Sequence, residues 1–287
     1  MNKVSFVVLH FGDIKVTQKC IDSILQLDKQ ENISIVVVDN DYLKTSGERE
    51  ELQRQYQEER NIEWVQIAED IGFSKANNEG YRIAKEKYSP DYIVVTNNDI
   101  IFPQKDFIER VEMLYEVYPF EVLSPDVVSS DTGQHQSPID VQGRSLRQVD
   151  YTIWMNRICL KLFPIMYPLL QRNYDRARNQ NVNVALSERR DDVVPCGACL
   201  VVAGKFVTEE KMFVPETHFY YEEYILHERC RRAGYRVVFE PSVQVLHGDG
   251  LATKGKNKTE KQKLRFVMEE TVKAAKIYKT LLQDKDQ

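Results

Sequence analysis

The sequence predicts an α/β fold: a mainly parallel, Rossmann-like sheet flanked by helices, within one domain that carries an elaboration. Strand-like apolar runs alternate with helix-like segments across the first 125 residues, as in parallel sheets. The run Tyr92–Val95 consists of β-branched or aromatic residues without charge, which is typical of a strand covered on both faces. The chain of 287 residues is 42% hydrophobic, so it can bury a large core.

The predicted elements of the first half follow in a regular order. A strand over Val4–Leu9 precedes apolar residues at helical spacing, and a second strand covers Ile33–Val38. A charged helix over 46–60 leads to a third, alternating strand over Ile62–Ile67. A helix that begins near Ser74 then leads to the central strand. No dinucleotide-binding glycine motif follows the first strand and no P-loop occurs, which disfavours a dinucleotide-binding protein and a P-loop nucleotide-binding protein.

The second half breaks this order between about 130 and 192. After this insertion, the residues from Asp192 to Ala203 predict a loop that enters a strand, and a helix runs from about Tyr220 to Gly234. Two short strands are predicted over Val237–Glu240 and Val243–Leu246. We place the main domain over 1–250. We expect a flexible basic loop and a C-terminal amphipathic helix over 251–287.

The insertion contains an apolar segment, Ile158–Leu170, among basic residues. The segment has two prolines and is too short to cross a bilayer. It fits a surface-lying segment beside anionic lipid head groups on the inner membrane. It fits equally a helical insertion that packs on the core or against a second subunit in a homodimer.

Composition restricts the compartment and the partners. The net charge of -5 argues against a general nucleic-acid binder. The apolar run near the start is too brief for a signal peptide, and we expect a cytoplasmic protein. The odd number of cysteines, five, fits reduced thiols. Cys196 and Cys199 form a C-x-x-C motif, but it enters an apolar strand and lacks a second ligand pair, so a zinc or redox role is disfavoured.

Polar clusters stand at four places where strands end, and in open α/β sheets ligands bind at the carboxyl ends of strands. The clusters are Asp39, Asp70, Asn97–Asp99 and His247. Asp39 is placed to accept hydrogen bonds from a base or ribose. Asp99 offers the hard oxygen ligands that Mg²⁺ or Mn²⁺ prefers. His247 can supply a further ligand or a phosphate contact. We therefore expect the clusters to meet in one cleft.

These clusters predict a displacement at a diphosphate. A cation that bridges the diphosphate would neutralise the charge on the leaving group. The lysines after His247, of which Lys254 is the first, could close over it as a lid. The attacking group then needs a base, and Glu222 or Glu223 is the candidate, since adjacent carboxylates disfavour double ionisation. Acids at a helix start also suit the helix dipole without any catalytic role.

Five motifs occur in a fixed order and spacing: Val36–Asn40, Asp70–Gly80, Thr96–Ile100, Gly197–Leu200 and Phe219–Tyr235, the last followed by His247. With this set, the chain from residue 4 to about 250 resembles the family 2 inverting glycosyltransferases of GT-A fold. It is most similar to the rhamnosyltransferase-like members that build bacterial surface polysaccharides. The resemblance implies transfer of a sugar, with rhamnose as the candidate, from a nucleoside-diphosphate sugar to a hydroxyl of a saccharide or lipid-linked glycan.

The resemblance also implies residue roles. Asp39 would contact the base or ribose, with Asp70, Asn97, Asn98 and Lys254 also on the nucleotide side.

On the metal and acceptor sides, Asp99 would be the metal ligand, with His247 beside it. Glu223 would be the catalytic base, with Glu222 next to it. Gly197 and Ala198 would line the acceptor side.

Several positions depart from the family pattern. Asn97 replaces an acid found in many members, and a neutral amide contributes less charge to a metal site. Glu223 stands where Asp is usual, which shifts the carboxylate by one methylene. Ile225 replaces a frequent second Asp, and Asp70 and His10 occupy positions where Asn is more usual.

Two other functions are compatible with parts of the pattern. A non-catalytic relative that binds a nucleotide or glycan would tolerate these departures. A sugar nucleotidyltransferase would also be α/β and metal-dependent, but it would carry a Gly-rich loop with Arg after the first strand, where this chain reads Leu9–Asp13.

Overall fold

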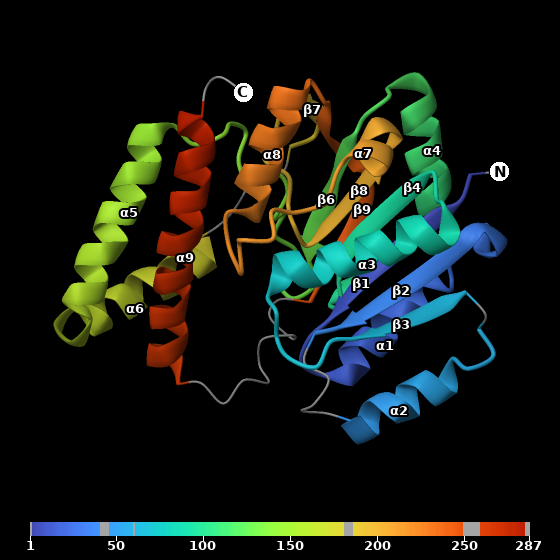
Figure 1. Ribbon diagram of the computed structural model, residues 1–287, viewed down its shortest axis with the longest axis horizontal. Coiled ribbons are helices and arrows are strands. Elements are labelled where there is room, and N and C mark those ends of the chain that lie inside the picture. The colour runs from blue at the N-terminus through green and yellow to red at the C-terminus, as the bar shows by residue number, and fades with distance from the viewer. Residues whose placement is uncertain (1, 41–45, 60, 181–185, 249–258, 285–287) are drawn as a thin grey trace.

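The computed structural model describes all residues except 1, 41–45, 60, 181–185, 249–258 and 285–287. The described residues form one nine-stranded sheet in the order β3-β2-β1-β4-β8-β6-β9-β5, with β7 paired to β9. Helices cover the sheet, and a separate group of helices stands beside it (Figure 1). This arrangement confirms the predicted α/β class.

The first half of the sheet is parallel. It comprises β1 (Val4–His10), β2 (Ile33–Asp39), β3 (Ile62–Gln66) and β4 (Tyr92–Asn97). Every residue of β1 and β2 is buried, because helices pack on both faces. The first face carries α1 (Ile14–Ile24), α2 (Ser46–Gln55) and α4 (Phe107–Val117), and the second carries α3 (Phe73–Tyr88). The carboxyl ends of these parallel strands therefore share one edge.

The second half of the sheet is mixed. It comprises β6 (Val122–Ser129), β8 (Cys199–Ala203), β9 (Val237–His247) and the short β5 (Ile100–Ile101) and β7 (Arg190–Asp191). β8 runs antiparallel to β4 and β6, so the start of β8 lies at the edge where β4 ends. The prediction of two short strands over 237–246 is wrong. They form one strand, because an irregularity opposite Pro125 and Asp126 absorbs Pro241 without ending the pairing with β6.

The predicted insertion supplies two of the helices that stand beside the sheet. These are α5 (Leu146–Lys161) and α6 (Phe163–Gln180), and they pack with α9 (Glu260–Gln283). α5 and α9 each begin with a capping box, in which the side chains of the cap and of the third helical residue satisfy free backbone N–H groups. α9 also contacts α8 (Glu222–Ala233), while the short α7 (Gly204–Glu209) follows β8.

An aromatic cluster joins the helices beside the sheet to α8. Tyr278 of α9 is buried against Tyr221 and Tyr224, with ring centroids 5.7 and 5.9 Å apart. Val149 and Ile153 of α5 belong to the same cluster. Burial of these large side chains fixes the start of α8 relative to the helices of the insertion. Among the described residues, no helix is both long and apolar enough to span a membrane.

Candidate active site

Asp99 and His247 meet at the edge of the sheet. Both residues are predicted metal ligands, and His247 Nε2 lies 3.2 Å from Asp99 Oδ1. The contact follows from the strand pairing, since Ile100 in β5 pairs directly with His247 in β9. His247 Nδ1 lies 2.6 Å from Gln136 Oε1, a hydrogen bond that orients the ring and turns Nε2 toward Asp99.

The residues just before Asp99 have different surroundings. Asn98 is buried, and its amide donates to Phe11 O at 3.0 Å and to Thr17 Oγ1 at 2.8 Å. Its side chain therefore holds the loop between β1 and α1 in place. Thr17 Oγ1 also lies 2.5 Å from His10 Nδ1. The backbone of Asn97 donates to Ala198 O at 2.9 Å, which joins the end of β4 to the start of β8.

Asp39 ends β2 and forms an ion pair with Arg49 of α2. Both side chains are buried, so the helix supplies the charge that a buried carboxylate requires. Next to it, Asn40 donates to Asp70 Oδ1 at 3.1 Å and accepts from Ile71 N at 3.0 Å. Asp70 Oδ1 also accepts from Gly72 N at 3.0 Å. Asp39 at the end of β2 and Asp70 in the loop after β3 thus lie at the same sheet edge.

Glu222 and Glu223 occupy the first turn of α8. Burial, and then the neighbouring Glu223, raise the pKa of Glu222 well above its ordinary value. Its Oε2 is buried without a hydrogen-bond partner among the described residues. Burial also raises the pKa of Glu223, while the backbone N–H groups of Glu223 and Gly197 favour its ionised form. Both carboxyl groups therefore have raised pKa values, and perturbed pKa values of this kind are found in groups that transfer protons.

Glu223 lies directly against the predicted acceptor segment. A Cβ atom added to Gly197 would lie 2.7 Å from Glu223 Oε1 and 3.2 Å from its Cδ, so any larger residue would displace the carboxylate from this position. Ala198, the next residue, bonds to Asn97 through its carbonyl oxygen. A short path of contacts thus links the proposed base to the segment that ends at Asp99.

The backbone before Glu222 is strained. Tyr220 and Tyr221 adopt left-handed conformations with φ of 70° and 63°, which are uncommon for bulky residues and cost about 1–3 kcal/mol each. Arg144 of the insertion holds Tyr221 in place, with a 2.8 Å hydrogen bond to its hydroxyl. The Arg144 guanidinium also lies over the Tyr224 ring, 4.7 Å from its centroid. Such strain, when contacts from elsewhere maintain it, is characteristic of functional sites.

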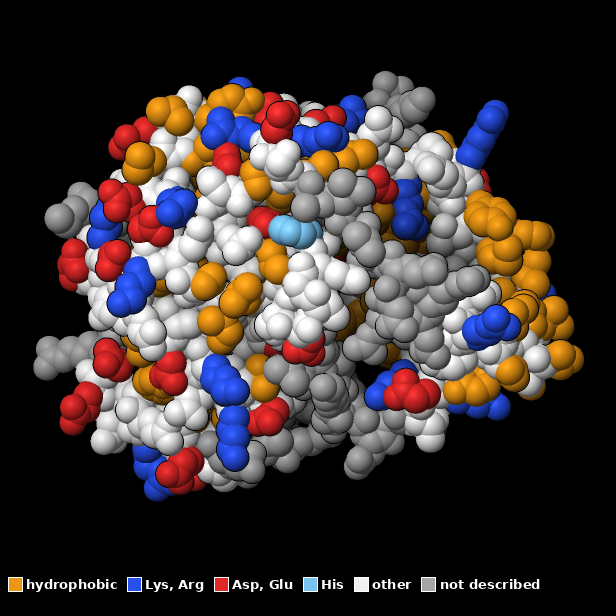
Figure 2. Space-filling view, turned by 180° about the vertical axis from the view of Figure 1, so that it is seen from behind, with side chains coloured by type: hydrophobic (Ala, Val, Ile, Leu, Met, Phe, Trp, Pro, Cys, Tyr) orange, Lys and Arg blue, Asp and Glu red, His pale blue; other side chains and the backbone are white. Residues whose placement is uncertain are grey.

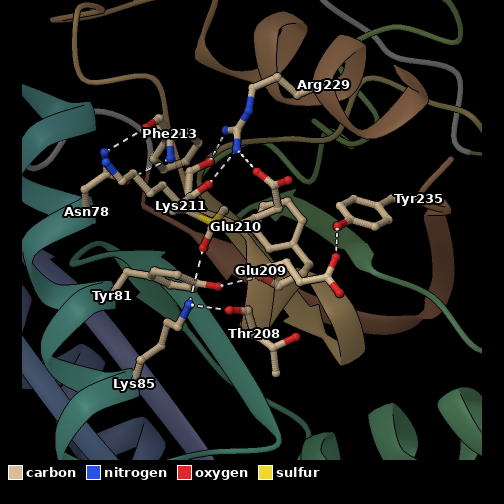
Figure 3. A network of polar contacts seen from close by, with 12 residues as sticks. Asn78, Tyr81, Lys85, Thr208, Glu209, Glu210, Lys211, Phe213, Arg229 and Tyr235 are labelled. Atoms are coloured by element: carbon tan, nitrogen blue, oxygen red, sulfur yellow. Dashed lines mark hydrogen bonds and ion pairs between the residues drawn. The ribbon is translucent and has the colours of Figure 1, made fainter. Parts of the chain in front are cut away.

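The segment that leads into α8 is fixed on two sides (Figure 3). Asn78 of α3 exchanges two hydrogen bonds with the backbone of Phe213, at 2.7 and 2.8 Å. Arg229 of α8 donates to the carbonyl oxygens of Lys211 and Met212 at 2.9 and 3.1 Å, and it pairs with Glu210. Further along, Ser74 Oγ and Thr217 Oγ1 lie 2.7 Å apart. These contacts hold the glutamate-bearing helix on α3.

Asp99 and His247 fit a divalent cation whose coordination shell is completed by oxygen atoms of a bound substrate. The described residues contain no group of three or more His, Cys, Asp or Glu side chains that could hold a metal alone. Asp99 and His247 form a pair, and apart from His247 the buried Asp99 Oδ1 has no hydrogen-bond partner in the described structure. Mg²⁺ and similar ions are commonly bound by one or two carboxylates together with substrate phosphates. The chemistry of the pair is thus compatible with a cation that arrives with a diphosphate.

Several residues in the site were not predicted from the sequence. Arg49, Asn40, Gln136 and Arg144 each contact a predicted site residue or its neighbour. Asn40 follows Asp39 directly and ends the motif Val36–Asn40, so its position could have indicated it. The others lie on distant segments and have no local pattern. Lys254 and the rest of the predicted basic loop lie outside the described residues.

Two comparisons of the sequence with known proteins gave different results. The family model described as glycosyl transferase family 2 matches residues 5–182. No curated protein matches the sequence.

Solved structures show a similar fold. A structure of S. aureus TarS 1-349 superimposes with a TM-score of 0.54 at 11% identity, covering 88% of this chain and 62% of that chain. A mannosyltransferase, PcManGT from Pyrobaculum calidifontis in complex with GDP-Man and Mn²⁺, has a TM-score of 0.54 at 13% identity and covers 98% of this chain and 73% of that one. The family match extends over more than half of the chain, and the chain belongs to glycosyl transferase family 2.

Proposed function

We propose that this protein is an inverting glycosyltransferase that moves a sugar from a nucleoside-diphosphate sugar to a hydroxyl of a saccharide or lipid-linked glycan. The observation that carries the proposal is the contact path from Glu223 through Gly197 and Ala198 to the segment ending at Asp99. It supports a base on one side of a sugar and a diphosphate site on the other. The complexes of TarS with UDP-GlcNAc and of PcManGT with GDP-Man and Mn²⁺ support the same donor class.

In the proposed reaction, Glu223 accepts the proton of the acceptor hydroxyl. The hydroxyl oxygen forms a bond to the anomeric carbon as the bond from that carbon to the diphosphate oxygen breaks, and its electron pair leaves with the diphosphate. One displacement inverts the anomeric configuration. Asp99 and His247 would hold the divalent cation, which when bound neutralises charge on the departing diphosphate. Asp39 and Asp70 would position the nucleoside.

The resemblance to rhamnosyltransferase-like members makes rhamnose the donor sugar to test first and surface polysaccharide the proposed product. The five free, buried cysteines support a reducing compartment such as the cytoplasm.

The test combines binding and turnover. Purified protein is incubated with uridine, thymidine and guanosine diphosphate sugars, with and without Mn²⁺, while sugar transfer and release of the nucleoside diphosphate are measured. Asp99→Ala should abolish metal-dependent nucleotide binding. Glu223→Gln should spare donor binding and remove transfer. Full transfer activity in Glu223→Gln would show that the catalytic base is Glu222 or another residue. Binding without turnover for every donor and acceptor tested would favour a non-catalytic protein that binds a nucleotide or glycan.

A further inference from the structure

The helices of the insertion expose large apolar side chains on the side that faces away from the core. We call this surface the outer face of α5 and α6 and define it by the exposed residues Tyr151, Trp154, Met155, Leu162, Ile165 and Leu169. Ile165 is 81% exposed and Trp154 is 57% exposed. Figure 2 shows hydrophobic side chains gathered with basic ones at this end of the molecule, on the right of the view. Large exposed apolar patches of this kind mark interaction sites.

The outer face is distinct from the face that packs on the protein. α5 buries Val149 and Ile153 against α9, and α6 buries Phe163. A second apolar stripe on α5 follows its own helical spacing, with Tyr151, Trp154 and Leu162 on the opposite side. Tyr151 and Trp154 also contact each other, with ring centroids 6.1 Å apart. The core therefore does not account for these residues.

Cations share the outer face with the apolar residues. On α5, Arg147 lies four residues before Tyr151, and Lys161 lies seven residues after Trp154. Both spacings place the cation on the same side of the helix as the aromatic residue. On α6, Arg172 follows Leu169 by three residues. These three side chains and that of Arg157 are exposed.

The acidic charge on this surface is small. Between residues 146 and 173 the sequence contains one acid, Asp150, and the structure pairs it with Lys279 at 2.5 Å. The chain as a whole carries a net charge of -5, so this basic surface runs against the average.

We propose that the outer face of α5 and α6 docks on an anionic lipid surface. Trp and Tyr favour the membrane interface, the aliphatic residues would enter the acyl boundary, and Arg and Lys would contact the lipid phosphates. A second copy of this chain would present the same cations to one another, and like charges would oppose that contact. α9 contacts both α5 and α8, so docking would hold the glutamate-bearing helix near the lipid. The docking itself does not require the proposed transfer reaction.

Vesicle flotation tests the docking without any donor sugar. The full chain should bind vesicles made of equal parts phosphatidylcholine and phosphatidylglycerol, and it should bind phosphatidylcholine vesicles far less. Added salt should weaken the binding, because ions screen the charge attraction. Equal binding to both vesicle types, or none to either, would overturn the proposal.

Matched variants separate the outer face from general surface effects. Arg147→Gln with Lys161→Gln should lower the partition coefficient about 25-fold, at roughly fivefold per cation, whereas Lys205→Gln with Lys211→Gln should leave it unchanged. Trp154→Ser with Ile165→Ser should lower it by about tenfold or more. The control for this pair is Met113→Ser with Val117→Ser, two exposed α4 residues.

Circular dichroism checks that each variant is folded, and light scattering reports the oligomeric state. Unchanged vesicle binding by the folded outer-face variants would refute the docking surface. A wild-type dimer that these variants convert to a monomer, together with no vesicle binding, would assign the face to a second copy instead.

Discussion

Gly197→Ala tests the contact between the acceptor segment and the proposed base. The added Cβ would lie 2.7 Å from Glu223 Oε1, whereas ordinary contact begins at 3.4 Å, so the carboxylate must move by about 0.7 Å. Displacements near 1 Å in an active site can cost about 100-fold in rate. We therefore expect kcat to fall about 10- to 100-fold, or ~1.4–2.7 kcal/mol in the activation barrier. Donor binding should change little, because the added methyl group contacts Glu223 rather than the predicted nucleotide residues.

The assay compares the initial rate of nucleoside diphosphate release with the donor dissociation constant measured by calorimetry. Gly47→Ala is the matched control, since a Cβ there meets nothing within 4 Å and its backbone needs no left-handed conformation. This control should keep full activity and gain stability of ~0.4–1 kcal/mol, because alanine can adopt the helical backbone of Gly47 at the start of α2 and has fewer unfolded conformations than glycine. A folded Gly197→Ala protein with unchanged kcat would refute the assigned contact between base and acceptor segment.

Three further predictions follow from the charges in the site. Burial raises the pKa of Glu223, and a catalytic base must be ionised. As the pH is lowered, kcat should therefore begin to fall at a pH above the usual pKa range of glutamate. A pH profile of kcat without this decrease would contradict the assignment of Glu223 as the base. Glu222→Gln should raise the melting temperature at neutral pH, because the raised pKa of Glu222 means that ionisation of this carboxyl destabilises the fold as pH increases. The gain in melting temperature should become smaller as the pH is lowered toward the ordinary pKa of glutamate. A gain that does not depend on pH would contradict this cause. His247→Ala should weaken Mn²⁺-dependent nucleotide binding by about 10- to 100-fold in calorimetric titration. Gln136→Ala should weaken this binding less, because Gln136 orients the His247 ring and is not itself a proposed ligand. Equal affinity in wild type and His247→Ala would exclude His247 as a ligand.

The parallel half of the sheet was predictable because its signals are local. β1, β2 and β4 are buried on both faces, and their uncharged runs record that burial directly. The mixed half was less predictable. The pairing of β9 with β6 joins segments more than 100 residues apart, and Pro241 interrupts the apolar pattern that would have revealed one strand.

The candidate site divides in the same way. Asp99 and His247 follow recognisable strands, so their positions at strand ends could be inferred from the sequence. Their partners could not, because Gln136 and Arg144 lie in or beside irregular segments that only the tertiary structure brings to the site. The pairing of Asp39 with Arg49 likewise depends on how α2 packs on the sheet. Sequence patterns therefore indicate where functional groups end a strand, whereas packing decides what holds them.

The most direct test of the central claim is the position of Mn²⁺ in crystals soaked with Mn²⁺ and a nucleoside diphosphate, located by anomalous diffraction. The proposal predicts one strong peak at about 2.1 Å from an Asp99 carboxylate oxygen, with His247 Nε2 as a second ligand and the diphosphate on the side that faces Glu223. A peak bound by other residues, or a diphosphate on the far side of the sheet from Glu223, would contradict it.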